Sequence, residues 1–196
     1  FKCKYIDKVK IQGDPKHFEK GNWYHWLLEN YPNPPEESWE WKFNGAEKQA
    51  EYMDYIRAFL KDPHTQWLTK ECKSAREHLF QYRGTTEDYQ AIDGSKWTSM
   101  CYGYIDLLAL DPEDPYHVIL VDWKSQSNSK LKLPSAQMDL YAAWAFLYMP
   151  KAEKVTVEYG FIQNVEYASY TYTRADSESL IQSVINRIDT ADKTTD

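Results

Sequence analysis

The chain has 196 residues and a formal net charge of −7, and 42% of its residues are hydrophobic. This length and composition favour one globular domain over 1–196 with a sizeable core, closed by a frayed tail over 191–196. The acidic balance argues against a large nonspecific nucleic-acid surface.

No stretch approaches the roughly 18 apolar residues of a membrane span, and no signal-peptide pattern opens the chain. We therefore expect an intracellular, cytoplasmic protein with no membrane partner. The chain begins with Phe1 instead of methionine, so a trimmed amino end stays an open alternative.

The first predicted elements are helical. Residues 21–29 favour a helix that carries His25 among aromatic and apolar residues, and a lone histidine of this kind is usually a satisfied core residue. Further helices are predicted over about 45–61 and 66–76. A loop is expected over 33–37, where two prolines follow an asparagine.

Two strands are predicted within 77–110, the second over 102–110, and an apolar, β-branched run predicts a buried strand over 117–124. Side chains alternate along a strand, so Asp122 and Lys124 should point the same way, opposite to Trp123. Turn chemistry over 111–115 favours an antiparallel pair that can bring Asp106 beside Asp122.

This arrangement has a chemical consequence. Asp106 lies inside an apolar strand, which is costly unless the carboxylate is paired or coordinates a metal. Two clustered carboxylates bind a hard divalent cation, and Lys124 beside them can orient water and offset charge on a phosphoryl group. The alternative is a solvated Asp-x-Lys pair at the end of a strand.

A helix is predicted over 134–148, with Ser135 as its start signal and Pro150 as its stop. Gln137 and Tyr141 are one turn apart and share a face, which is also common on ordinary amphipathic helices. Met138, Ala142 and Ala145 are expected to form its packed face. Strands over 154–159 and 168–174 and a helix over 177–188 complete the pattern.

Basic residues and cysteines add two constraints. Lys124, Lys130 and Lys132 follow one another with no acid among them and could guide a phosphate backbone toward the site.

The three cysteines, Cys3, Cys72 and Cys101, are an odd number without paired spacing, which argues against a disulfide framework.

Five short motifs follow one another along the chain: Gly21-x-x-x-His25, Glu77-x-x-Phe80, Gly103-x-x-Asp106, Asp122-x-Lys124 and Gln137-x-x-x-Tyr141. In this order they resemble the RecB-like branch of the PD-(D/E)XK nuclease superfamily, over residues 1 to about 175. The resemblance implies an α/β fold with a restriction-endonuclease-like core, in which helices flank a mixed central β-sheet.

The resemblance also implies roles. The implied metal ligands are His25, Asp106, Asp122 and the backbone carbonyl of Trp123, and the implied catalytic lysine is Lys124. Gln137 and Tyr141 would flank the site and touch substrate. Glu77 is either a supporting or second-metal carboxylate or a solvated glutamate beside Arg76, and Asp122 stands where many relatives have the longer glutamate.

We thus expect a Mg²⁺- or Mn²⁺-dependent DNA exonuclease, encoded by a bacterium or phage, that acts in recombination, repair or DNA processing with a recombination or replication protein as a possible partner. An iron–sulfur cluster like that of many Cas4-type relatives is not expected, because it takes four cysteines. The alternatives are a structure-selective endonuclease and a catalytically silent module that binds DNA ends or a protein. Polarity, strand preference, the number of metals and oligomeric state stay open.

Overall fold

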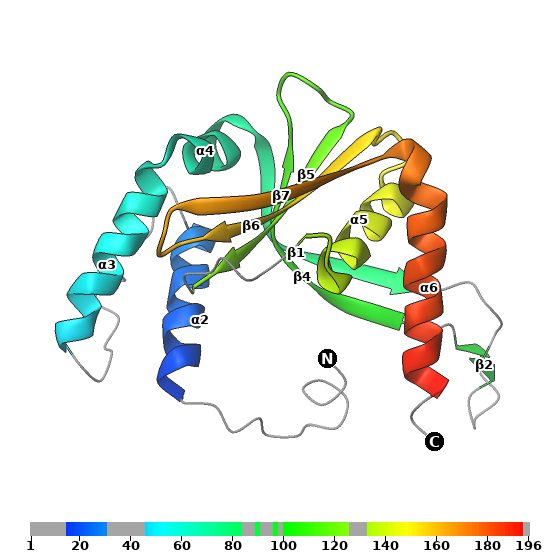
Figure 1. The fold of residues 1–196 in the computed structure, drawn as a ribbon, viewed down its shortest axis with the longest axis horizontal. Helices are drawn as coiled ribbons and strands as arrows, with labels where there is room; N and C mark the ends of the chain where they lie inside the picture. Colours follow the sequence, from blue (N-terminus) through cyan, green and yellow to red (C-terminus); the bar gives the residue numbers. More distant parts are fainter. Residues whose placement is uncertain are drawn as a thin grey trace.

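The computed structural model describes residues 15–30, 46–83, 89–90, 96–97, 100–125 and 133–193 (Figure 1). Within them, five strands form one mixed sheet in the order β1-β4-β5-β6-β7. The strands are β1 (Lys73–Arg83), β4 (Met100–Leu110), β5 (His117–Lys124), β6 (Lys154–Phe161) and β7 (Glu166–Thr173). Among these described strands only β5 and β6 pair in parallel. A separate two-stranded ladder joins β2 (Tyr89–Gln90) to β3 (Lys96–Trp97).

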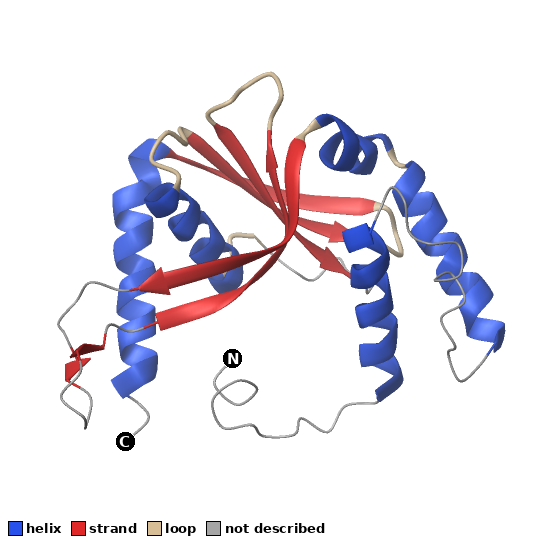
Figure 2. Cartoon of the chain, turned by 180° about the vertical axis from the view of Figure 1, so that it is seen from behind, coloured by secondary structure: helices blue, strands red, loops and turns tan. Residues whose placement is uncertain are grey.

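Helices cover both faces of the sheet (Figures 1 and 2). One face packs against α5 (Ala136–Tyr148) and α6 (Ser177–Lys193), which follows the short 3₁₀ turn η3 (Arg174–Asp176). The other face packs against α2 (Pro15–Asn30), α3 (Ala46–Lys61) and the π-helical turn η2 (Trp67–Glu71), which follows α4 (Pro63–Gln66). The predicted α/β architecture, a mixed sheet flanked by helices, is confirmed.

Strand β5 shows why the sheet is buried on both sides. Val118 and Leu120 pack into the α5 and α6 side, whereas Ile119 and Val121 pack into the α2 and α3 side. A parallel pairing with β6 requires a crossover connection, and α5 supplies it. The predicted bounds of β5 match the structure.

Helix α5 begins where its sequence signal indicated. The hydroxyl of Ser135 accepts a hydrogen bond from the backbone N–H of Met138 at 3.3 Å, which caps the first turn. Met138, Ala142 and Ala145 are fully buried as predicted. The buried surface is wider than one stripe, because residues 141–146 are all buried between the sheet and α6.

Some predicted bounds are wrong. The helix predicted over 66–76 ends at Glu71, and β1 begins at Lys73, because pairing of ten β1 residues with β4 overrides local helix propensity. Residues 191–193 belong to α6 instead of a frayed tail. The loop expected over 33–37 lies outside the described residues. None of the described helices is long and apolar enough to cross a membrane.

Gly160 fixes the end of β5 against the α3 side. It pairs with Trp123 across the β5–β6 ladder, and a Cβ at this position would lie 2.6 Å from two carbon atoms of the Trp123 ring. The missing side chain lets the Trp123 ring lie over β6 and meet Phe59 of α3 edge-on, with 5.5 Å between ring centroids. This packing holds the backbone of the segment that carries Asp122 and Lys124.

Candidate active site

The candidate site lies where β4 and β5 separate. Their pairing runs from Leu110 opposite Val118 to Leu107 opposite Val121 and goes no further. Beyond this point a side chain of β4 replaces the backbone as hydrogen-bond acceptor. The Oδ2 of Asp106 accepts a hydrogen bond from the backbone N–H of Trp123 at 2.6 Å. Asp106 is therefore held between the two strands.

Both β1 and β4 change their side-chain alternation at this point. Ile105 packs on the α5 side but Leu107 packs on the α2 side, although residues two apart normally share a face. Opposite them, Glu77 has φ = 47°, in the left-handed region that costs a residue other than glycine about 1–3 kcal/mol. The register is kept on both sides of Glu77, so the irregularity is local and points two carboxylates toward α2.

His25 of α2 meets these carboxylates. Its Nδ1 lies 3.3 Å from Oδ1 of Asp106 and 3.9 Å from Oε1 of Glu77. One ligand atom from each of the three side chains lies within 4.8 Å of the others. One imidazole and two carboxylates from three separate elements form a donor set suited to a divalent cation.

The charges around His25 favour its protonated form. Burial lowers the pKa of His25, but hydrogen bonds to Asp106 and Glu77 and the charges of Asp106 and Asp122 outweigh burial and raise this pKa to about 10. In the absence of a metal, a proton on the imidazole therefore balances part of the carboxylate charge.

Asp122 and Lys124 form the second half of the site. Asp122 is 6% exposed; its Oδ2 lies 2.5 Å from the ammonium of Lys124, and its Oδ1 accepts a hydrogen bond of 2.8 Å from the amide of Gln137. Burial and the nearby charge of Asp106 raise the pKa of Asp122 to about 6, against the opposing effect of Lys124. When it is ionised, the carboxylate of Asp122 adds to the negative charge of the site, and the ammonium of Lys124 compensates this charge directly.

Gln137 and Tyr141 support Asp122 from α5. The amide of Gln137 also donates to the hydroxyl of Tyr141 at 2.8 Å, and this hydroxyl donates to the backbone carbonyl of Tyr104 at 3.0 Å. Tyr141 is 5% exposed, and its burial raises the pKa of the phenol. The two residues therefore connect β4 to the carboxylate of Asp122 by a chain of hydrogen bonds.

The sequence-based residues fall into two adjoining groups. The first group consists of His25, Glu77 and Asp106, whose ligand atoms lie close together. The second group is built around the carboxylate of Asp122. That second group contains Asp122, Lys124, Gln137 and Tyr141. The carbonyl of Trp123 stays a predicted ligand, and Lys130 and Lys132 lie outside the described residues.

Sequence reasoning missed the ring of Tyr159, whose centroid lies 5.0 Å from the Lys124 ammonium. Tyr159 pairs with Asp122 in the parallel β5–β6 ladder. No local pattern marks this tyrosine, because its place depends on the register between two strands that are separated by α5.

Comparison with known proteins identifies the family. The model of the PD-(D/E)XK nuclease superfamily matches residues 1–195, and the chain therefore belongs to that superfamily. Comparison with curated proteins gives no match. Among solved structures, a protein of Eubacterium rectale with a provisional exonuclease assignment is similar at a TM-score of 0.47 and 11% identity, over 94% of this chain and 71% of its own. The protein SSO0001 is similar at a TM-score of 0.36 and 13% identity, over 92% of this chain and 88% of its own.

Membership defines the class of protein: the superfamily consists of nucleases, which hydrolyse nucleic acid and use divalent metal ions. The donor set of His25, Glu77 and Asp106 fits such an ion by the identity and closeness of its ligand atoms.

Proposed function

We propose that the chain is a Mg²⁺- or Mn²⁺-dependent DNA exonuclease of the RecB-like branch. It would act in DNA recombination, repair or processing inside a bacterium or a phage-infected cell, where a recombination or replication protein could deliver DNA ends to it. The observation that carries the proposal is the convergence of the His25, Glu77 and Asp106 group with the Asp122–Lys124 pair at the split between β4 and β5.

In this proposal, His25 and Asp106 hold the cation, Glu77 supports it, and Asp122 and the carbonyl of Trp123 complete the ligand set. The bound cation would polarise the phosphoryl group and activate water for attack. The buried position of Asp106 and its bond from the Trp123 N–H keep this carboxylate in one orientation, so little reorganisation is needed when the cation arrives.

Lys124 has a separate task. Its ammonium lies beside Asp122 at the end of β5, and 24% of its side chain is exposed, so a phosphate that approaches the carboxylates from solvent can contact it. There the ammonium would offset the negative charge that builds on the phosphoryl oxygens during attack. Gln137 holds the other oxygen of Asp122 and so restricts the rotation of this carboxylate.

Two other functions are compatible with the same scaffold: a structure-selective endonuclease, and a catalytically silent module that binds DNA ends or a protein. Digestion of linear and covalently closed circular DNA, single- and double-stranded, separates the three. Mg²⁺, Mn²⁺ and a chelator are compared, and Asp106→Asn serves as the matched inactive variant.

An exonuclease degrades only the linear substrates and stops in chelator. Cutting of closed circles by the wild type but not by Asp106→Asn would replace the proposal with the endonuclease. Binding without metal-dependent cutting would favour the silent module, and chelator-insensitive cutting would contradict the proposed chemistry altogether.

A further inference from the structure

An exposed apolar pair lies next to the carboxylates of the site. Leu79 of β1 and Tyr104 of β4 are cross-strand partners, and their exposed fractions are 45% and 56%. Each is two residues from a carboxylate of the candidate metal group, Leu79 from Glu77 and Tyr104 from Asp106. At about 3.3 Å per residue, the pair lies roughly 7 Å along the strands from those carboxylates.

The pair faces the same side of the sheet as the metal group. Its neighbours Phe80 and Ile105 pack into the α5 side, and a Cβ at Gly103 would collide with Phe80 on that side. Because side chains alternate, Leu79 and Tyr104 project to the opposite side, the one from which His25 approaches.

The ring of Tyr104 has no internal task in the described part of the chain. Buried tyrosines of this protein use their hydroxyls as structural contacts: Tyr141 with the Tyr104 carbonyl, Tyr159 with Ser135, and Tyr172 with Asp139. No hydrogen bond, ring contact or ion pair of the described residues involves the Tyr104 side chain. The backbone of Tyr104 is nonetheless held in place. Its carbonyl accepts a hydrogen bond from the hydroxyl of Tyr141, and Gln137 links that hydroxyl to the carboxylate of Asp122.

We propose that Leu79 and Tyr104 form a platform on which a nucleobase of the substrate strand stacks, next to the phosphate that is cut. This inference rests on the proposed function. A separation of roughly 7 Å equals about two stacked nucleotides at 3.4 Å each, so a strand whose phosphate lies at the metal group brings a base over the pair. The carboxylates by themselves would repel the phosphate. The platform is uncharged, so it contacts the base without adding to that repulsion.

The occupant follows from position. A molecule that covers Leu79 and Tyr104 lies roughly 7 Å along the strands from the carboxylates of the site, and the substrate class there is nucleic acid. Stacking on an aromatic ring tolerates every base, so the platform would strengthen binding of an unpaired or frayed strand without a sequence preference.

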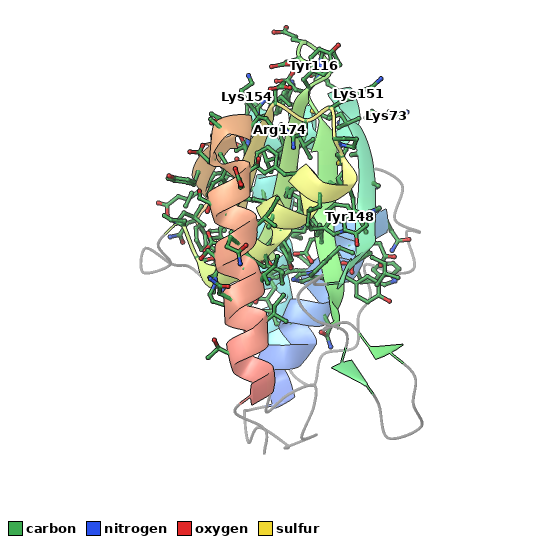
Figure 3. The ribbon with its side chains drawn as sticks, turned by 90° about the vertical axis from the view of Figure 1, so that its right-hand side faces the viewer. Lys73, Tyr116, Tyr148, Lys151, Lys154 and Arg174 are labelled. Carbon is green, nitrogen blue, oxygen red and sulfur yellow. The ribbon has the colours of Figure 1, made fainter. Side chains whose placement is uncertain are left out.

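The test uses the full chain and oligonucleotides that carry one abasic nucleotide at successive positions. Binding is measured by fluorescence anisotropy in a Lys124→Ala background, in which cleavage is slow enough for binding to be read before the substrate is cut. Cleavage is measured by single-turnover kinetics with Lys124 intact. The variants are Tyr104→Ala, Tyr104→Phe and Leu79→Ala. Tyr116→Ala is the matched control, since Tyr116 is a 51% exposed tyrosine in the turn that joins β4 to β5, at the end of the molecule shown uppermost in Figure 3.

Loss of the ring in Tyr104→Ala should weaken binding of the intact oligonucleotide about tenfold, and Tyr104→Phe should stay within about twofold of the parent. Leu79→Ala should have a smaller effect in the same direction, and Tyr116→Ala none. At one position the abasic nucleotide should weaken binding to the Tyr104 parent by a similar factor but add nothing to Tyr104→Ala, because the stacking contact is already gone.

The platform is contradicted if Tyr104→Ala binds and cuts like the parent, or if the abasic and Tyr104→Ala losses add at every position. In both cases the proposed function survives, because the wild type still cuts with metal. If the wild type neither binds nor cuts nucleic acid, the proposed function and the platform both fail.

Discussion

Among the described residues, His25 and His64 face buried carboxylates, and the charges around the two imidazoles differ. The ring of His64 in α4 meets one carboxylate, with its Nε2 2.9 Å and 3.0 Å from the two oxygens of Glu158 on β6, and Asp62 adds its charge nearby. His25 meets two carboxylates, Asp106 and Glu77, and a third, Asp122, adds its charge nearby.

The surroundings of the two histidines differ as well. The ring of His64 contacts Trp67 and Tyr167, with centroid distances of 5.7 Å and 4.6 Å, so it takes part in the packing between α4 and the sheet. The carboxylates around His25 come from three strands: β4 and β5 separate beside them, and Glu77 of β1 adopts a strained backbone. The His64–Glu158 pair holds α4 against the sheet, whereas the carboxylates that meet His25 outnumber it, which fits the proposed cation site.

The largest effect should come from removing one of the carboxylate charges around His25. Asp106→Asn keeps an oxygen that can accept from the Trp123 N–H but removes a charged ligand, so we expect cleavage to fall at least about 10³-fold, with loss of metal binding and retention of the fold. Single-turnover cleavage, calorimetric titration with Mn²⁺ and circular dichroism measure the three effects. A variant that still cuts within tenfold of the wild type would remove Asp106 from the site.

Lys124→Ala should have the next largest effect. If the ammonium stabilises charge that develops on the phosphoryl group, cleavage falls roughly 10²-fold while the metal still binds, because the His25, Glu77 and Asp106 group is intact. The rate and the metal affinity are measured on the same preparation. Loss of metal affinity together with activity would instead assign Lys124 to the support of Asp122.

His25→Ala should weaken metal binding at least about tenfold, for Mn²⁺ more than for Mg²⁺, because imidazole suits Mn²⁺ better. Only neutral imidazole binds a metal, and the pKa of His25 is raised to about 10, so metal binding to the wild type should release a proton and tighten as the pH rises from 6 to 9. Calorimetry in buffers of different ionisation enthalpy measures the proton release.

The matched control for that measurement is His64→Ala, which should leave both metal affinity and its pH dependence unchanged. If His25→Ala also leaves the affinity for both ions and its pH dependence unchanged, His25 is an ordinary structural histidine. The contacts of His25 and His64 would then both be structural.

The smallest expected effect concerns the pair of His64 and Glu158. The hydrogen bond to Glu158 raises the pKa of His64 despite partial burial, and the charges of Glu158 and Asp62 add to this. The pair therefore stabilises the fold fully below the ordinary imidazole pKa of about 6.5, and this stabilisation is lost as the pH rises through the raised pKa. Because 38% of the His64 side chain is exposed, the effect is modest.

Urea unfolding of the wild type and of His64→Gln checks this expectation. The difference in unfolding free energy should be largest near pH 6 and should shrink toward pH 9. Glu158→Gln should remove the same pH-dependent part, and a difference that is constant with pH would show that the pair acts only through packing.

Much of the fold could be predicted from local pattern. The apolar run at 117–124 specified β5, and Ser135 marked the start of α5. The error at 66–76 arose because residues 73–76 include good helix formers, and only their pairing with Leu107–Leu110 makes them a strand. For the same reason, nothing in the sequence indicated that the alternation of β1 and β4 would shift at Glu77.

The sequence by itself determined which chemistry is available: the carboxylates of Asp106 and Asp122, the amine of Lys124 and the imidazole of His25 lie in an order that marks the superfamily. Which groups touch was decided by the tertiary structure. The left-handed backbone of Glu77 and the end of the β4–β5 pairing place Glu77 and Asp106 against His25, while Gln137 and Lys124 take the oxygens of Asp122. These contacts join elements far apart in the chain, and their geometry depends on strand register and helix packing, which local patterns do not encode.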